Sequence, residues 1–333
     1  MDAQAFTELT DEILRLHRAG DYGPALELAT REASRFPERA GRIGFWRACL
    51  AARLNDTPLA LEVLAEALAS GYWWPASMLR EEKDLQPLQG LPEFERLVAL
   101  SREQQRAVQA EAKPDLLVLE PAIPAGKSMP LLLALHGSNQ NAGDAAEAWR
   151  PAVDAGWLVA LPESGQVSWD GRDPRARMWT DRDQAVRELE SHWASLQQRY
   201  PITPQTEVLA GFSAGGQLAL WLVLSGTLPI HRCFLVAPSL LPGALQQLLP
   251  LVEPAASRGP AVYIVVGDHD RWSTEGACRM VEALREHGVA CDMEVHAGLS
   301  HEFPPDFERS LTRGLGFLLG QGQSEIAEAT ATL

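Results

Sequence analysis

One serine lies in a short glycine-rich segment that could present it as a nucleophile. Ser213 stands between Gly211 and Gly215, after the apolar run 208–210 and before the helical pattern 214–226. A strand, a sharp turn and a helix in this order hold a serine in a strained backbone conformation and project its hydroxyl above a sheet. Because so short a motif can arise by chance, its interpretation depends on the residues that accompany it.

Acidic and histidine residues follow two other predicted strands. One strand leads into Asp268 and Asp270, and a later one leads to His296 and His301. Sites in open α/β sheets form at the carboxyl ends of strands, so these side chains and Ser213 are expected at one edge. A serine needs a base within hydrogen-bond reach and an acid that orients the base. The sequence therefore indicates acyl-transfer chemistry, with two acids and two histidines as candidates.

The elements that must position these residues alternate along the second part of the chain. Strands are expected at 116–119, 131–135, 157–161, 207–210, 233–236, 262–266 and 292–296. Helices are expected near 143–155, 183–199, 214–226, 273–288 and 305–319. Apolar strands separated by amphipathic helices predict an α/β fold with a mostly parallel sheet covered by helices on both faces. We assign this domain to residues 112–320 and a flexible tail to 321–333.

The first part of the chain, residues 1–111, shows helical periodicity and no strand-like run. The segment 20–26 recurs as 55–61, a spacing typical of helix-turn-helix repeats, and Ala25 and Ala60 would let paired helices approach closely. This all-α domain resembles the tetratricopeptide repeat. So short an array needs a neighbour to bury its faces. We expect it to support the second domain or a homo-oligomer, and the alternative is a groove for a peptide partner.

Residues 115–319 resemble the α/β-hydrolase superfamily. The resemblance rests on the chain order nucleophile, acid, histidine at successive strand ends. It points to carboxylesterases, phospholipase/carboxylesterase-type enzymes and dienelactone-hydrolase-like proteins. The segment 135–141 is similar to the polyhydroxybutyrate-depolymerase and feruloyl-esterase group. The resemblance implies a serine esterase that acts on small soluble esters and uses neither a metal nor another cofactor.

The resemblance also implies a role for each residue. Ser213 would be the nucleophile, His301 the base and Asp270 the acid that fixes the imidazole tautomer. The backbone N–H groups of Ser138 and Ala214 would form the oxyanion hole.

The usual positions in the family favour one candidate of each competing pair. Asp270 stands three residues after the glycine that ends its strand, and His301 lies on the loop beyond its strand. Asp268 and His296 are the alternatives.

The long connection 162–182 is expected to shape the substrate pocket. Trp169 and Trp179 could wall an acyl or aryl group, and Arg177 could meet a carboxylate or phosphate. The alternative is a surface loop with solvated arginines. The segment 237–259 is too short for a large cap domain, which favours short soluble esters.

Bulk properties exclude several classes of protein. The net charge of −15 disfavours binding to nucleic acid and to anionic membranes. The chain has no long apolar run and no basic, apolar leader at its N-terminus, so we expect a cytoplasmic protein. The four cysteines show no CxxC spacing and are expected to be free thiols.

Two other functions stay open. A thioesterase or peptidase could use the same three residues, because the sequence does not separate oxygen, sulfur and amide leaving groups. A partner-binding protein with a vestigial hydrolase domain is the second alternative, although an intact triad argues against it.

Overall fold

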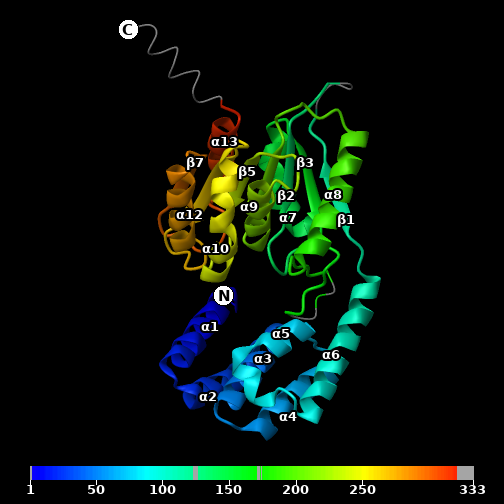
Figure 1. Ribbon diagram of the computed structural model, residues 1–333, viewed down its shortest axis with the longest axis vertical. Helices are drawn as coiled ribbons and strands as arrows, with labels where there is room; N and C mark the ends of the chain where they lie inside the picture. The colour runs from blue at the N-terminus through cyan, green and yellow to red at the C-terminus, as the bar shows by residue number, and fades with distance from the viewer. Residues whose placement is uncertain (1, 123–126, 171–172, 174, 321–333) are drawn as a thin grey trace. The chain divides into compact units, whose positions relative to one another are not determined.

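The structure is a computed structural model that describes residues 2–122, 127–170, 173 and 175–320 (Figure 1). The chain forms two compact units. Of the described residues, one comprises 2–113 with 167–170, 173 and 175–176, and the other comprises 114–122, 127–166 and 177–320. The tail predicted at 321–333 lies outside the described residues.

The first unit is a stack of helices in which α3 packs against both α2 and α4. Its α-helices are α1 (Asp2–Ala19), α2 (Tyr22–Glu32), α3 (Ala40–Arg53), α4 (Thr57–Ala69), α5 (Ala76–Glu81) and α6 (Pro92–Glu111). Its 3-10 helices are η1 (Ala33–Arg35), η2 (Pro37–Arg39) and η3 (Lys83–Leu88).

The two copies of the sequence repeat adopt the same turn. Gly20 and Asn55 both have positive φ, at 82° and 60°, within two residues of the end of a helix. In each turn the following aspartate, Asp21 or Asp56, donates its backbone N–H to a carbonyl of the preceding helix and then precedes the next helix. A residue with positive φ ends a helix without continuing it, which explains why glycine and asparagine stand here.

The described residues between 167 and 176 belong to the helical unit, although the sequence placed them in the α/β domain. Trp169 lies 6.4 Å from Phe45, measured between ring centroids. The Asp170 side chain is fully buried and pairs with Arg42 at 2.6 Å and Arg39 at 3.5 Å. A buried carboxylate requires such partners, and both arginines lie far away in the sequence.

The second unit contains a seven-stranded sheet in the order β1-β3-β2-β4-β5-β6-β7. Its strands are β1 (Asp115–Leu119), β2 (Leu131–Leu135), β3 (Leu158–Glu163), β4 (Val208–Phe212), β5 (Arg232–Val236), β6 (Ala261–Gly267) and β7 (Ala290–His296). Strand β1 pairs antiparallel with β3, and the other neighbours are parallel. The predicted α/β fold with a mostly parallel sheet is confirmed.

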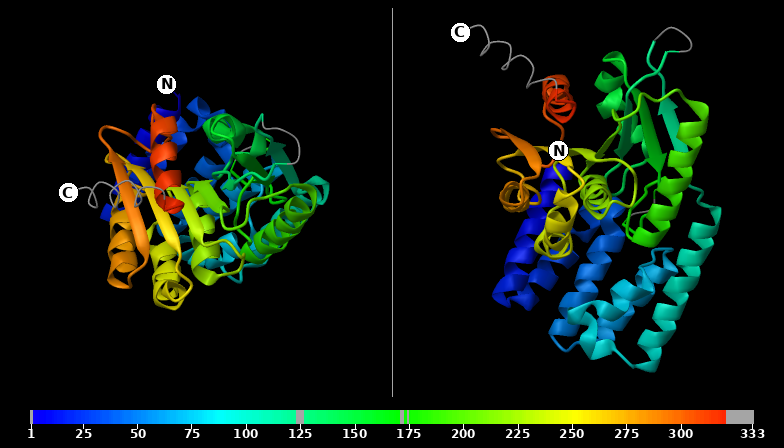
Figure 2. Two further views of the ribbon diagram at one scale, coloured as in Figure 1. Left: turned by 90° about the horizontal axis from the view of Figure 1, so that it is seen from above. Right: turned by 45° about the horizontal axis from the view of Figure 1, so that its top comes forward.

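Helices cover both faces of this sheet, as two further views show (Figure 2). Leu131, Leu133 and Leu135 of β2 pack into one core, and Leu132 and Ala134 pack into the other, because successive strand residues point to opposite faces. The first core is closed by α8 (Arg182–Arg199), α9 (Ala214–Ser225), α10 (Pro242–Leu248), η4 (Leu249–Leu251), α11 (Val252–Ala256) and α12 (Thr274–Glu286). The second is closed by α7 (Ala142–Asp154) and α13 (Phe307–Leu318).

Among the described residues, no helix is both long and apolar enough to cross a membrane.

Candidate active site

Ser213 occupies a sharp turn between β4 and α9. Its φ of 54° and ψ of −118° lie in a region that side chains other than glycine rarely adopt. Backbone hydrogen bonds hold this conformation. The Ser213 N–H donates to Val236, and its carbonyl accepts from Gln217 and Ser239. The strain therefore persists because the surrounding backbone fixes both sides of the peptide.

The glycines around Ser213 allow backbones to touch. A Cβ at Gly211 would lie 2.4 Å from the carbonyl carbon of Gly215. A Cβ at Gly215 would lie 2.4 Å from the carbonyl oxygens of both Leu135 and His136. The turn is thus packed directly on the end of β2, from which the loop to Ser138 departs.

Three predicted residues come together in a line of hydrogen bonds. His301 Nε2 lies 2.8 Å from Ser213 Oγ, and His301 Nδ1 lies 2.9 Å from Asp270 Oδ2. A carboxylate can only accept, so Nδ1 carries the proton and Nε2 is left as an acceptor. Ser213 then donates its hydroxyl to His301.

The Asp270 carboxyl is held in its ionised form. Its side chain is fully buried, and burial alone would raise its pKa. Hydrogen bonds from His301, from Ser273 and from the Trp272 N–H outweigh burial, so the pKa of Asp270 lies below its ordinary value. A buried negative charge is thereby maintained beside the imidazole.

Asp268, the alternative acid, bonds to a neighbouring loop and not to His301. Asp268 Oδ1 accepts the Gly298 N–H at 2.6 Å, which ties the loop after β6 to the loop that carries His301. A Cβ at Gly267 would lie 2.0 Å from the carbonyl oxygen of Leu299, so these two loops also touch through backbone.

The alternative histidine faces other groups. His296 contacts Ser310 at 3.2 Å and Glu294 at 3.1 Å. These partners lie on α13 and on β7 itself, whereas His301 reaches Ser213.

The loop that carries Ser138 is fixed on both sides. The Gly137 N–H donates to Gln140 Oε1 at 2.8 Å, and the Asn139 N–H donates to the Arg177 carbonyl at 2.8 Å. The Arg177 N–H in turn donates to the Gln140 carbonyl. The Ala214 N–H belongs to the first turn of α9, where amide groups have no acceptor within the helix.

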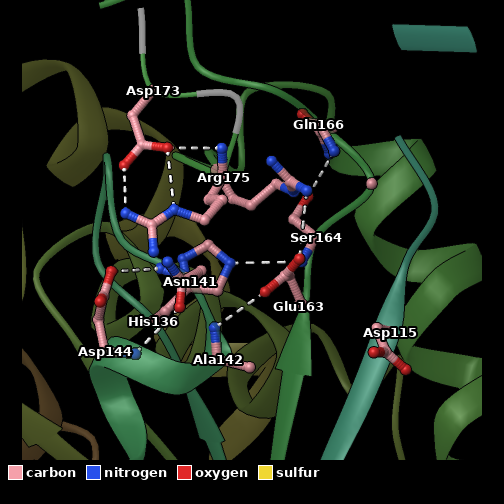
Figure 3. A network of polar contacts seen from close by, with 12 residues as sticks. Asp115, His136, Asn141, Ala142, Asp144, Glu163, Ser164, Gln166, Asp173 and Arg175 are labelled. Atoms are coloured by element: carbon pink, nitrogen blue, oxygen red, sulfur yellow. Dashed lines mark hydrogen bonds and ion pairs between the residues drawn. The ribbon is translucent and has the colours of Figure 1, made fainter. Parts of the chain in front are cut away.

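His136 is a buried structural residue next to this loop (Figure 3). Its Nε2 accepts from the Ser164 N–H at 3.3 Å, so Nδ1 carries the proton and donates to the Gly137 carbonyl at 2.8 Å. Burial, aided by the charge of Arg177, lowers the pKa of His136 to about 4. The ring is therefore neutral at neutral pH and stacks on Trp179 at 4.6 Å.

A pocket of about 250 Å³ lies within the second unit. Its lining includes Ala214, the residue that follows Ser213 in the chain. Trp179 is among its walls, together with residues of α9 and α10. The helix α10 was not foreseen in the sequence, which suggested only an apolar flap between residues 237 and 259.

Two residues predicted for the pocket have partners within the protein. Trp169 belongs to the helical unit, where it packs on Phe45 and lies under the Arg42 guanidinium. Arg177 is 9% exposed and pairs with Glu163 at 3.2 Å, so its charge is already matched inside the protein. Both side chains therefore contact other residues of the protein, and their contact with a substrate stays a prediction.

No group of three or more His, Cys, Asp or Glu residues that could hold a metal ion occurs in the described part of the chain.

Two family models match the chain in succession. A family described as "Putative esterase" matches residues 109–317, which is more than half of the chain. A family described as "A/B hydrolase-like, N-terminal domain" matches residues 5–110. None of the curated proteins matches the chain.

Two solved structures are similar to the chain. An uncharacterized protein from Bacillus cereus is 23% identical with a TM-score of 0.53, over 94% of this chain and 98% of that one. The esterase PE8 is 19% identical with a TM-score of 0.49, over 62% of this chain and 99% of that one. The first likeness extends over both units and shows the fold alone.

Proposed function

Because the chain belongs to the esterase family, we propose that it cleaves small carboxylic esters through a triad of Ser213, His301 and Asp270. The observation that carries the proposal is the line of hydrogen bonds from Asp270 through His301 to Ser213, at 2.9 and 2.8 Å. Both distances lie within the range in which a base can take a proton from a nucleophile.

In the first step, Ser213 Oγ attacks the ester carbonyl carbon and His301 Nε2 takes the hydroxyl proton. The imidazolium that forms carries a positive charge beside Asp270, whose buried carboxylate stabilises it. Asp270 keeps its negative charge throughout, because the pKa of its carboxyl is held low.

The carbonyl oxygen becomes an oxyanion that needs hydrogen-bond donors. We assign these donors to the backbone N–H groups of Ser138 and Ala214. The contact between Gly215 and the His136 carbonyl keeps the two segments at a fixed separation. Preformed donors of this kind are each worth about 3 kcal/mol of transition-state stabilisation.

The intermediate collapses when His301 gives its proton to the leaving oxygen and the carbon–oxygen bond of the ester breaks. Ser213 then carries the acyl group. Water attacks this acyl-enzyme with His301 again as the base, which releases the acid and restores the serine. Apart from the ester and this water, every group named in the cycle belongs to the chain.

The experiment that tests the proposal is hydrolysis of p-nitrophenyl acetate and butyrate by wild type and Ser213→Ala. We expect the variant to lose at least about 1,000-fold in kcat, because it has no nucleophile. Ser225→Ala, at the other end of α9, is the matched control and should keep wild-type turnover.

Covalent labelling by a fluorophosphonate gives a second readout. Wild type should be labelled at Ser213. A folded protein that resists labelling, or a Ser213→Ala variant with wild-type turnover, contradicts the triad and favours a binding role. Matched ester, thioester and aminoacyl-amide substrates then separate the esterase from a thioesterase or a peptidase.

A further inference from the structure

The pocket beside Ala214 combines apolar walls with one charged group. All of its described lining residues belong to the second unit. The apolar ones are Trp179, Leu218, Trp221 and Leu248, and the polar ones are Thr180, Arg182, Gln217 and Gln247. The only charged side chain in this lining is therefore a cation, in a chain with a net charge of −15.

The guanidinium of Arg182 is held by neutral partners. It lies 4.6 Å from the centre of the Trp221 ring and donates to Gln247 Oε1. Within the part of the chain that the structure describes, no carboxylate forms an ion pair with it. Arg177, by contrast, has its charge matched by Glu163. Arg182 therefore brings to the pocket a positive charge that no acid of the described residues neutralises.

This arrangement suits a carboxylate. A guanidinium presents five N–H donors in a planar fork, and a carboxylate accepts two of them side by side. Stacking on Trp221 and the bond to Gln247 fix the plane of the fork before a ligand arrives. Because the fork is already ordered, less conformational entropy is lost on binding.

The pocket lies on the acyl side of the proposed reaction. Its lining includes Ala214, the proposed oxyanion donor, and residues of α8, α9 and α10. None of the described lining residues comes from the loop that carries His301. Since His301 must reach the leaving oxygen, the leaving group belongs near that loop and the acyl group belongs in the pocket.

The size of the pocket fits a short acyl group. A volume of 250 Å³ corresponds to roughly eight water-sized atoms at about 30 Å³ each. A chain of four to six carbons that ends in a carboxylate has about this many non-hydrogen atoms.

We propose that this pocket selects acyl groups that end in a carboxylate, so that the enzyme prefers half-esters of short dicarboxylic acids. The inference rests on the proposed function. Hydrolysis of such a half-ester breaks the acyl carbon–oxygen bond and adds water, which gives a dicarboxylate, an alcohol and one proton released to solvent. Arg182 determines specificity, since it binds the distal carboxylate and takes no part in the proton transfers.

The test compares two p-nitrophenyl esters of equal length. One is the half-ester of adipic acid, and in the other a neutral methyl ketone replaces the distal carboxylate. Rates are corrected for spontaneous hydrolysis and expressed as the ratio of the two kcat/KM values. We expect wild type to favour the anionic ester. Arg182→Gln should lower the ratio by roughly 10- to 100-fold, the usual strength of a hydrogen bond to a charged group. The ratio for Arg182→Lys should lie between those for wild type and Arg182→Gln.

Arg187→Gln is the matched control, because it removes the same charge from an exposed position of the same helix. It should leave the ratio unchanged. Inhibition of wild type by free adipate, and not by neutral adipamide, gives a readout that needs no variant.

The outcomes separate the two proposals. Wild type that hydrolyses the neutral ester through Ser213 but shows no preference for the anionic one overturns the inference and leaves the triad standing. An unchanged ratio in folded Arg182→Gln overturns it as well. If Ser213→Ala hydrolyses both esters at the wild-type rate, the proposed function itself is overturned.

Discussion

Replacing Gly215 by alanine tests whether backbone contact positions the proposed oxyanion hole. The new Cβ would lie 2.4 Å from the carbonyl oxygens of Leu135 and His136, whereas ordinary contact begins near 3.4 Å. Both obstacles are backbone atoms, which cannot rotate away. The turn that carries Ala214 and the loop that carries Ser138 must therefore separate by about 1 Å.

A displacement of this size should lower kcat strongly. Misplacing reacting groups by about 1 Å can lower a rate roughly 100-fold, and losing one oxyanion donor lowers kcat by roughly 100- to 1,000-fold. We expect Gly215→Ala to lose about 100- to 1,000-fold in kcat on p-nitrophenyl butyrate. KM should change much less, because the donors act in the transition state.

The matched control is Gly316→Ala, in the last turn of α13. A Cβ there meets nothing within 4 Å, and alanine favours a helix. Each activity is normalised to the folded fraction, measured by circular dichroism during thermal unfolding. A folded Gly215→Ala variant that keeps kcat within about threefold of wild type would refute the idea that this contact sets the donor geometry.

Two further predictions concern groups that act through His301 and His136. Asp270→Asn should fold normally and lower kcat by about 10,000-fold, because an amide permits the wrong imidazole tautomer. Steady-state kinetics near neutral pH measure this loss, and a loss of less than about tenfold contradicts the role assigned to Asp270. His136 has its pKa lowered to about 4 in the folded state, against an ordinary value of 6.5. The unfolded state therefore binds this proton first as pH falls, so stability should be fully present above pH 6.5 and decline by about 3 kcal/mol towards pH 4. Urea unfolding across this range should show a shallower decline in His136→Gln, and equal slopes in both proteins would contradict the burial argument.

The parts of the molecule that the sequence predicted well depend on local pattern and on chain order. Each predicted strand of the α/β domain lies within two residues of an observed one, since runs of apolar residues between helices leave few alternatives. Parallel strands bring their carboxyl ends to one edge, so Ser213 and the candidate acids and histidines could be named from the sequence. The preference for Asp270 over Asp268 and for His301 over His296 came from the resemblance to the hydrolase family.

The path of the long connection depends on partners that no local pattern reveals. Asp170 finds Arg39 and Arg42 more than 120 residues earlier in the chain, which draws Trp169 into the helical unit. Arg177 is drawn inward by Glu163 in the same way. The pocket arginine, Arg182, stands at the start of a helix, where charged residues are common and no motif sets it apart.

Backbone contacts position the residues of the site, and side-chain contacts join them. Gly215 lets the serine turn touch the end of β2, and Gly267 lets the loop after β6 touch the loop of His301. The hydrogen bond between His301 and Ser213 then joins the two halves. Because glycines and main-chain atoms fix this geometry, the neighbouring pocket can change its side chains without moving the triad. Selectivity for the acyl group can therefore reside in Arg182, whose replacement should alter the choice of substrate more than the chemistry of the serine.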